Sequence, residues 1–295
     1  IQNSEGFVKQ PYINISGHTE ENRFVSIRSE IDGQVIELLK GKGNQVKQGD
    51  TLLKISLDDR RAKLSEAKAL VAERKLQYDA ALKLKKQNFR SETNVANAKS
   101  QLESAQAALT SIQKSIDDTN VLAPFDGFVQ DTDVEVGSYV KVGDNMIDLV
   151  ELNPLKVIAF VSETDLPHIE INQEAEIELA TGEKVIGTVD YISAVAESRT
   201  RTFKIELNTP NPDQLLKSGV TANLKLPKPK LKVHKISSAV LLLNDDGVLG
   251  VHTIDDKNIV QFVPVKVVTH NSPNLYITGL PDTAKIISVG QEFVR

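Results

Sequence analysis

The chain has 295 residues, of which 40% are hydrophobic and 25% charged, and its formal net charge is −5. This length can bury several small cores, and the acidic balance argues against a general nucleic-acid binder, which would carry a basic face. The absence of cysteine excludes disulfides and thiolate metal sites. No run approaches the roughly 20 apolar residues of a membrane span. No signal peptide is recognisable at Ile1, so we expect a mature or trimmed chain whose export signal, and any lipid anchor, has been removed.

The first 24 residues predict one or two strands, around residues 12–16 and 23–25. No other strand lies close enough in sequence to pair with them. We therefore expect these strands to join sheets formed mostly by the C-terminal half of the chain, which implies domains built from separate segments.

One sequence motif occurs twice, at a constant offset of 94 residues. Its first copy runs from Asp32 to Asp50 and its second from Asp126 to Asp144. Both copies place glycine and aspartate at the turns expected between short strands, namely Gly33, Gly43, Gly49 and Asp50 in the first copy and Gly127, Gly137, Gly143 and Asp144 in the second. Each copy can bury only one face, so two copies related by a pseudo-twofold axis predict a small β-sandwich.

Two long runs between the copies, residues 58–87 and about 92–118, contain neither Gly nor Pro and are rich in helix-forming residues. Heptad positions give the second run an apolar seam of Val95, Ala98, Leu102, Ala105, Leu109, Ile112 and Ile116, and the first run a weaker seam of Leu64, Ala67, Val71, Tyr78 and Ala81. These seams predict an antiparallel hairpin with arms of roughly 40 Å. Burial of the helices against a globular core is disfavoured because their outer faces are charged.

Residues 154–227 contain several strands with period-two alternation and a short helix that starts near Ser162. This pattern predicts a six-stranded barrel. Residues 231–295 are again rich in strands and hairpin turns, including the turn of residues 244–247.

No catalytic or phosphate-binding motif is present. The five histidines have no second histidine or carboxylate at ligand spacing, and the single methionine, Met146, argues against methionine-based copper binding. We therefore expect no enzyme activity, no cofactor and no metal site.

A sandwich interrupted by a helical hairpin, entered through residues 25–35 and left through residues 121–129, resembles the periplasmic adaptor subunits of Gram-negative tripartite efflux pumps. These adaptors are also called membrane fusion proteins, of the HlyD-like family. The resemblance covers nearly the whole chain and is greatest for adaptors of resistance-nodulation-division (RND) pumps. It implies a mainly β chain with an α-helical hairpin, in an elongated multidomain arrangement.

The resemblance predicts four domains. A lipoyl-like sandwich comprises residues 25–57 and 118–153, and the coiled-coil hairpin comprises residues 58–117. The β-barrel comprises residues 14–24 and 154–230, and a membrane-proximal β-roll comprises residues 1–13 and 231–295. Within the barrel, Arg199, Thr200, Arg201 and Thr202 before a strand, and Gly219 at a turn, resemble the family's barrel signature.

At the hairpin tip the family carries an Arg, a Leu four residues later and a Ser seven residues after that, which dock on the outer-membrane channel. Leu84 and Ser91 match the Leu-to-Ser spacing, but Ala80 occupies the Arg position. Lys83 and Lys85 could supply the positive charge, although without the bidentate geometry of Arg. We therefore expect Leu84, Ser91, Lys83 and Lys85 to contact the channel, while Leu84 and Ser91 could also serve as a buried turn residue and a helix N-cap.

The function implied by the resemblance is mechanical. The chain would lie in the periplasm, attached to the inner membrane, and link an inner-membrane transporter, of the RND type by resemblance, to an outer-membrane TolC-like channel. Self-association into a ring, a trimer or hexamer, would complete a sealed export conduit for drugs or other small toxic compounds.

Three alternatives compete with this prediction. The nearest is an adaptor of an ATP-driven or type I secretion exporter, which a longer hairpin or an N-terminal membrane helix would favour. More distant is a periplasmic ligand- or metal-binding protein, for which clustered ligand residues would be expected. A lipoyl or biotinyl carrier needs a modifiable lysine where this sandwich instead carries the helical arms.

Overall fold

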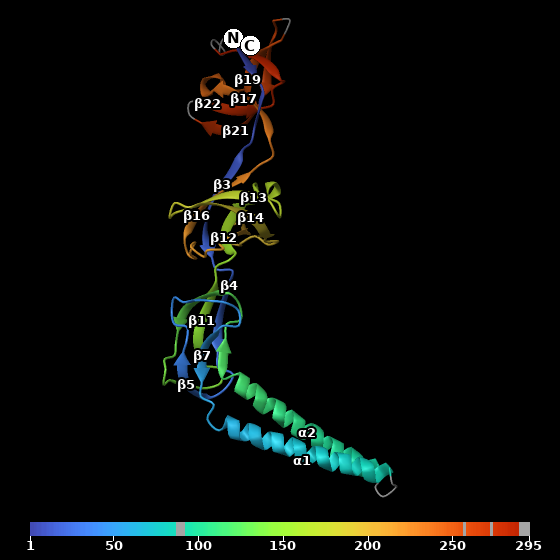
Figure 1. The fold of residues 1–295 in the computed structure, drawn as a ribbon. Coiled ribbons are helices and arrows are strands. Elements are labelled where there is room, and N and C mark those ends of the chain that lie inside the picture. The colour runs from blue at the N-terminus through green and yellow to red at the C-terminus, as the bar shows by residue number, and fades with distance from the viewer. Residues whose placement is uncertain (87–91, 256–257, 272–273, 289–295) are drawn as a thin grey trace. The chain divides into compact units, whose positions relative to one another are not determined.

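The structure is a computed structural model that describes residues 1–86, 92–255, 258–271 and 274–288 (Figure 1). The chain divides into two compact units, one of residues 1–20, 156–210 and 218–295 and the other of residues 21–155 and 211–217. Each unit is therefore assembled from segments that are far apart in the sequence. Among the described residues, the helices are too short or too polar to cross a membrane.

The second unit contains a β-sandwich of two four-stranded sheets. The first sheet has the order β10 (Tyr139–Val140), β5 (Gly33–Leu38), β7 (Thr51–Ile55) and β8 (Asn120–Leu122). The second has the order β4 (Arg23–Arg28), β11 (Asn145–Glu151), β9 (Gly127–Thr132) and β6 (Gln45–Val46). Alternate side chains of both sheets point inward and bury a common core, formed by Ile31, Val35, Val46, Leu52, Leu53, Ile55, Ala123, Phe125, Val129, Val134, Val140, Met146, Ile147 and Leu149.

The two copies of the sequence repeat complete each other in this sandwich. The backbone N–H of Gln48 donates to Asp126 Oδ1 at 2.7 Å, and the equivalent N–H of Val142 donates to Asp32 Oδ1 at 2.8 Å. Strand pairing follows the same offset, since β6 pairs with β9 as β10 pairs with β5, and β11 pairs with β4 as β7 pairs with β8. The sequence repeat is thus a structural repeat with a pseudo-twofold relation, and each copy supplies the aspartate that caps a turn of the other.

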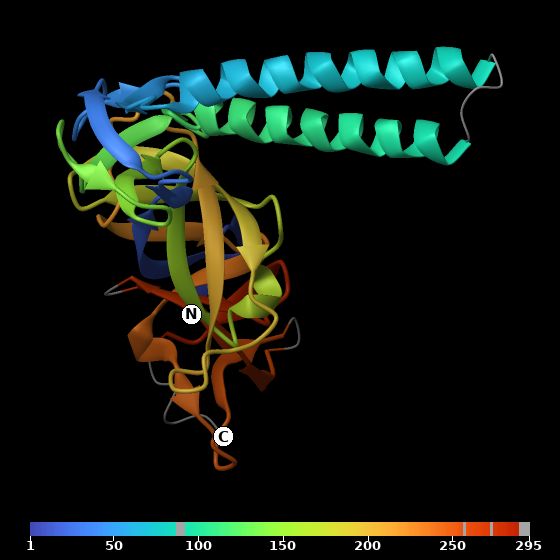
Figure 2. The ribbon, with the colours of Figure 1, turned by 90° about the horizontal axis from the view of Figure 1, so that it is seen from below.

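Two long helices, α1 (Arg60–Lys86) and α2 (Glu92–Asp117), run side by side and confirm the predicted hairpin (Figures 1 and 2). All predicted seam side chains of both helices are at least partly shielded from solvent. Arg74 fills the α1 seam position between Val71 and Tyr78, and its Nη1 donates to Gln101 Oε1 of α2 at 3.3 Å. A polar contact therefore interrupts the apolar seam near its middle.

The first unit contains a closed six-stranded barrel, as the alternation predicted. Its strands follow the order β12 (Leu155–Ser162), β15 (Thr202–Thr209), β14 (Lys184–Ile192), β13 (Glu174–Leu179), β16 (Thr221–Pro227) and β3 (Tyr12–Glu20). The N-terminal strand β3 closes the barrel by pairing with both β12 and β16. The expected helix near Ser162 is a short 3₁₀ helix, Leu166–His168, in the segment that joins β12 to β13.

Two further sheets complete this unit, and both include a strand from the N-terminus. One contains β1 (Gln2–Glu5), β23 (Thr283–Ile286), β19 (Leu249–Ile254), β18 (Leu242–Leu243) and β20 (Val260–Pro264). The other contains β2 (Phe7–Lys9), β17 (Leu231–Ser237), β22 (Asn274–Thr278) and β21 (Lys266–Asn271). A second 3₁₀ helix, Ser238–Val240, follows β17. The predicted pairing with the C-terminal half is present for β1, β2 and β3. It is wrong for residues 23–25, because they belong to β4, which pairs with β11 in the sandwich.

Candidate docking surfaces

The free end of the hairpin carries the side chains that the sequence singled out for channel docking. Lys83 is exposed and Leu84 is half-buried, while Ser91 lies outside the described residues. Lys85 Nζ lies 2.8 Å from Oε1 of Glu92, the first residue of α2, and this ammonium holds the pKa of Glu92 below its usual range. The ion pair joins the two helices where the chain reverses, and Lys83 keeps its charge toward solvent.

A shallow groove of about 400 Å³ lies between the helices close to this end. Its polar lining consists of neutral amides only, Gln77, Asn94, Asn97 and Gln101, beside the small residues Ala80, Ala81 and Ala98 and the side chain of Leu84. Amides can donate and accept hydrogen bonds at once, so this surface suits a partner helix with polar side chains. The sequence analysis missed the groove, although the amides flank the predicted seam at positions where charged residues are usual.

The base of the hairpin is fixed to the sandwich by two basic residues. Arg60 Nη2 donates to the backbone oxygen of Asp32 at 2.7 Å, and its Nε donates to Ser115 Oγ of α2 at 3.0 Å. Lys114 Nζ contacts Asp118 at 2.8 Å and Glu30 at 2.6 Å, and these two carboxylates raise its pKa. At its base, the hairpin is thus held together by a contact between its two helices, and it is held to the sandwich by the contacts with Asp32 and Glu30.

The predicted turn residues of the repeat adopt two different roles. Gly43, Gly49, Gly137 and Gly143 have φ angles of +82°, +85°, +100° and +94°, which side chains disfavour. The Oδ2 atoms of Asp50 and Asp144 accept the backbone N–H groups of Lys47 and Lys141 at 3.1 and 2.8 Å.

Gly33 and Gly127, by contrast, do not lie in turns but begin the strands β5 and β9. A Cβ atom on Gly127 would lie 2.2 Å from the carbonyl oxygen of Val150, and one on Gly33 would lie 2.5 Å from a methyl of Ile55. Glycine is needed at these two positions for close packing between neighbouring strands.

The residues of the expected barrel signature lie at two edges of the barrel. Arg199 and Thr200 belong to the turn before β15, Arg201 has a φ angle of +56°, and Thr202 begins the strand. Gly219, with a φ angle of +83°, precedes β16, and its N–H donates to the backbone oxygen of Thr19 on β3 at 2.8 Å. The Gly219 contact extends the pairing of β3 with β16 at this edge.

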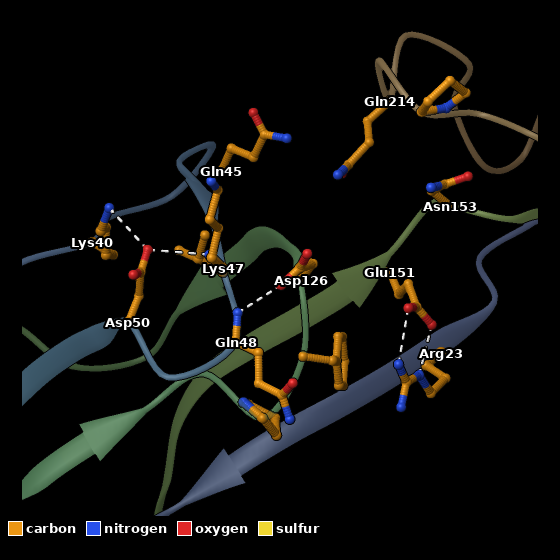
Figure 3. A pocket seen from close by; sticks show the side chains of 14 residues that line it. Arg23, Lys40, Gln45, Lys47, Gln48, Asp50, Asp126, Glu151, Asn153 and Gln214 are labelled. Carbon is orange, nitrogen blue, oxygen red and sulfur yellow. Dashed lines mark hydrogen bonds and ion pairs between the residues drawn. The ribbon is translucent and has the colours of Figure 1, made fainter.

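A polar pocket of about 670 Å³ opens at the end of the sandwich where β4 begins and β11 ends (Figure 3). Arg23 forms a bidentate pair with Glu151, with contacts of 2.6 and 2.9 Å, and its guanidinium lies 4.4 Å from the centre of the Phe125 ring. The hydrogen bonds from Arg23 lower the pKa of Glu151. Because three basic and three acidic side chains line the pocket, it does not favour ions of either sign.

The loop of residues 211–217 belongs to the sandwich unit although it joins two barrel strands in sequence. The side-chain amide of Asn211 donates to the backbone oxygens of Leu152 and Leu216 at 2.9 and 3.0 Å. Leu216 packs beside Val150 and Leu152. The loop therefore covers the sandwich at the end of β11. This contact was not predicted from the sequence.

Among the described residues, no group of three or more His, Asp or Glu side chains is arranged to hold a metal ion. His18 contacts Glu20 at 3.1 Å, and the buried His234 contacts Ser4 Oγ at 3.0 Å. Each of these two histidines therefore contacts one polar side chain of the protein.

Comparison with known protein families identifies the two central parts of the chain. Residues 23–151 match the barrel-sandwich hybrid domain of RND membrane fusion proteins, and residues 156–230 match the CusB-like β-barrel domain. These two matches adjoin each other and cover the sandwich, the hairpin and most of the barrel.

Similar curated proteins include the cobalt-zinc-cadmium resistance protein CzcB of Cupriavidus metallidurans, 27% identical over 78% of this chain and 48% of CzcB. The multidrug resistance protein MdtA of Proteus mirabilis is 25% identical over 90% of this chain and 71% of MdtA. An uncharacterised protein of Haemophilus influenzae is 26% identical over 74% of this chain and 58% of that protein. The chain thus spans about half the length of two of these relatives.

Solved structures agree in fold. A MacA-MexA chimera with the Pseudomonas aeruginosa MexA α-hairpin aligns with a TM-score of 0.77 at 16% identity, covering 98% of this chain and all of the chimera. A putative efflux transporter from Bacteroides eggerthii aligns with a TM-score of 0.66 at 19% identity, covering 92% of this chain and 86% of that one. These two structures show the shared fold, and the domain matches over residues 23–151 and 156–230 show that the chain belongs to the membrane fusion proteins of the RND type.

Proposed function

We propose that this membrane fusion protein is a periplasmic adaptor that links an inner-membrane RND transporter to an outer-membrane TolC-like channel. The observation that carries the proposal is the hairpin. Two helices of 27 and 26 residues leave a rigid sandwich, are fixed at their base by Arg60 and Lys114, and present polar side chains at their far end. Arms of about 40 Å suit a contact with a distant partner, because a firmly held base keeps the tip in a defined position.

The hairpin tip is the proposed channel-docking site. Lys83, Leu84, Lys85 and Ser91 are the residues we assign to it, together with the neutral amides of the groove between the helices. Helical partners pack well against a surface of small and amide side chains, because backbones can approach closely there. Lys83 adds a positive charge that an acidic channel rim would attract.

The remaining domains are proposed to assemble the conduit on the inner-membrane side. The barrel and the membrane-proximal sheets would bind the periplasmic part of the transporter, and the sandwiches would associate side by side into a ring. In this role the adaptor catalyses no reaction and holds no cofactor. The names of the relatives, one for cobalt, zinc and cadmium resistance and one for multidrug resistance, support toxic ions or drugs as cargo, which the transporter would select.

The docking proposal is tested by site-specific cross-linking in cell envelopes, which the absence of cysteine makes unambiguous. Lys83→Cys places a single thiol near the tip. Leu76→Cys is a matched control, because Leu76 is 72% exposed and occupies the same heptad position about 10 Å farther from the tip. We expect Lys83→Cys to cross-link to an outer-membrane channel at least tenfold more than Leu76→Cys. Equal cross-linking of both variants, or none from either in folded protein, would contradict docking by the tip.

A further inference from the structure

The sandwich exposes large apolar side chains mostly on one side. Six of them lie on or directly beside the strands of the β10-β5-β7-β8 sheet and are 47–66% exposed. We call this set the apolar face, comprising Ile36, Leu39, Leu122, Val136, Tyr139 and Val142. Exposed apolar groups that gather on one side of a domain usually mark an interaction surface.

The pseudo-twofold repeat provides an internal control for this observation. Subtracting or adding the offset of 94 gives the equivalent positions on the other sheet, which we call the polar face, comprising Gln130, Asp133, Arg28, Lys42, Gln45 and Gln48. All six are exposed and all six are polar. Because the backbone pairing of the two halves is the same, the local fold does not require apolar residues at these positions. A requirement outside the single chain must account for them.

Two further apolar side chains reach solvent at one edge of the opposite sheet. Phe24 and Val25 are consecutive residues of the edge strand β4 and point to opposite sides of it, and they are 51% and 38% exposed. They lie at the pocket end of the sandwich, since β4 begins there, beside the Arg23–Glu151 pair. Leu39 and Leu122 lie at the same end of the apolar face, because Leu39 follows the last residue of β5 and Leu122 precedes the pocket residues Pro124 and Phe125.

We propose that the apolar face packs against the β4 edge of a second copy of this chain, with Leu39 and Leu122 of one copy meeting Phe24 and Val25 of the next. This contact is heterologous, and a repeated heterologous contact closes a ring when the rotation from copy to copy adds up to a full turn. A twofold contact between two apolar faces would leave Phe24 and Val25 uncovered on both copies, whereas the heterologous contact covers the apolar face and the β4 edge. The six side chains expose roughly 600 Å², which approaches the ~800 Å² per partner of a specific interface.

This inference rests on the proposed function only for the ring, and it assigns the surfaces through which the ring forms. The polar face lies on the same sheet as the β4 edge and would meet the rest of the neighbour's apolar face. Arg28 and the amides there can cover apolar groups with their aliphatic stems. We therefore expect such a mixed interface to be weak, so that the copies associate only at high protein concentration.

The contact is tested with two single-cysteine variants of the purified chain, Leu122→Cys and Val25→Cys, carrying different affinity tags. Because each chain then holds one thiol, a cross-link between the tags forms only between copies. We expect oxidation of the mixture at high protein concentration to give a covalent dimer that carries both tags, and each variant alone to remain monomeric. A dimer of Leu122→Cys alone would establish the twofold contact and overturn the proposal, as would the absence of any cross-link.

The repeat also supplies substitutions that the fold already tolerates. Tyr139→Gln and Leu122→Arg place on the apolar face the residues found at the equivalent positions of the polar face, so folding should be preserved, as circular dichroism would verify. We expect the double variant to weaken self-association at least tenfold in sedimentation experiments, and the control Gln130→Ala to leave it unchanged. Unchanged association of the double variant would overturn the proposal. Because these experiments use the purified chain, they can fail while the tip still cross-links to a channel, and the reverse also holds.

Discussion

Fourteen hydrophobic side chains are buried in the core of the sandwich, whereas the described residues of the two helices bury just Ala81 and Ala105. The sandwich closes through reciprocal strand pairing and aspartate caps between its two halves. The hairpin has a narrow seam of small residues, interrupted by Arg74, and charged outer faces. Since buried apolar area is the main favourable term in folding, most of the stability of this unit must lie in the sandwich. The helix surfaces are then free to serve a partner.

The largest expected effect is a core truncation in the sandwich. Leu53 and Ile147 are equivalent residues of the two repeats, and both are fully buried. Leu53→Ala and Ile147→Ala should each lower the free energy of unfolding by about 2–5 kcal/mol, through lost burial and a new cavity. The pseudo-twofold relation predicts similar losses at the two sites, within the spread of roughly 2 kcal/mol found among chemically identical core truncations. Urea denaturation measures both, and a large inequality would mean that the two halves do not share the core equally.

A smaller effect is expected in the hairpin seam. Ala105 is 4% exposed against α1, so Ala105→Leu would force the arms apart and cost about 1–3 kcal/mol of hairpin stability. Ala107→Leu is the control, because Ala107 is exposed on the same helix. Thermal melting followed by far-ultraviolet circular dichroism should show an earlier loss of helix for Ala105→Leu, with the sandwich transition unchanged. If the sandwich melted earlier as well, the two regions would be coupled more tightly than their packing indicates.

The difference between the two regions also explains what the sequence could reveal. The repeat and the heptads are periodic patterns, so they predicted the sandwich, the hairpin and the apolar residues of its seam. Contacts between distant residues left no such pattern. Arg60 reaches Asp32 at a separation of 28 residues, and Arg23 reaches Glu151 at a separation of 128. Sequence alone could not single out either contact among the many acceptors available to an arginine.

Side-chain roles at special backbone positions were equally hard to foresee. Gly33 and Gly127 resembled turn glycines because they follow aspartate, but they begin strands and permit close packing. The loop of residues 211–217 follows a barrel strand, yet it packs on the sandwich through Asn211 and Leu216. Local sequence gives the conformation of a turn, but which neighbour it meets depends on the assembled fold.

The smallest expected effect concerns two carboxylates with lowered pKa, one in each region. The Glu151 side chain is 12% exposed beside Arg23, and that of Glu92 is 87% exposed beside Lys85. Hydrogen bonds from the basic partner lower the pKa of each. In acid the unfolded chain therefore binds more protons at these sites than the folded chain does. The stabilisation is complete above the ordinary glutamate pKa of about 4.3 and is lost as the pH falls through that value toward the folded pKa.

Salt should separate the two carboxylates, because ions screen an exposed pair far more than a shielded one. We expect Glu151→Gln to lower the stability of the sandwich at neutral pH with a weaker salt dependence than Glu92→Gln, because its carboxylate is 12% exposed although Arg23 is 54% exposed. The difference from the unsubstituted chain should shrink below about pH 4. Glu92→Gln should have a smaller effect, confined to helix melting at low salt. Urea denaturation across pH, repeated at two salt concentrations, measures both. Equal salt dependence of the two variants would mean that the half-exposed Arg23 leaves its pair as open to ions as the Lys85–Glu92 pair.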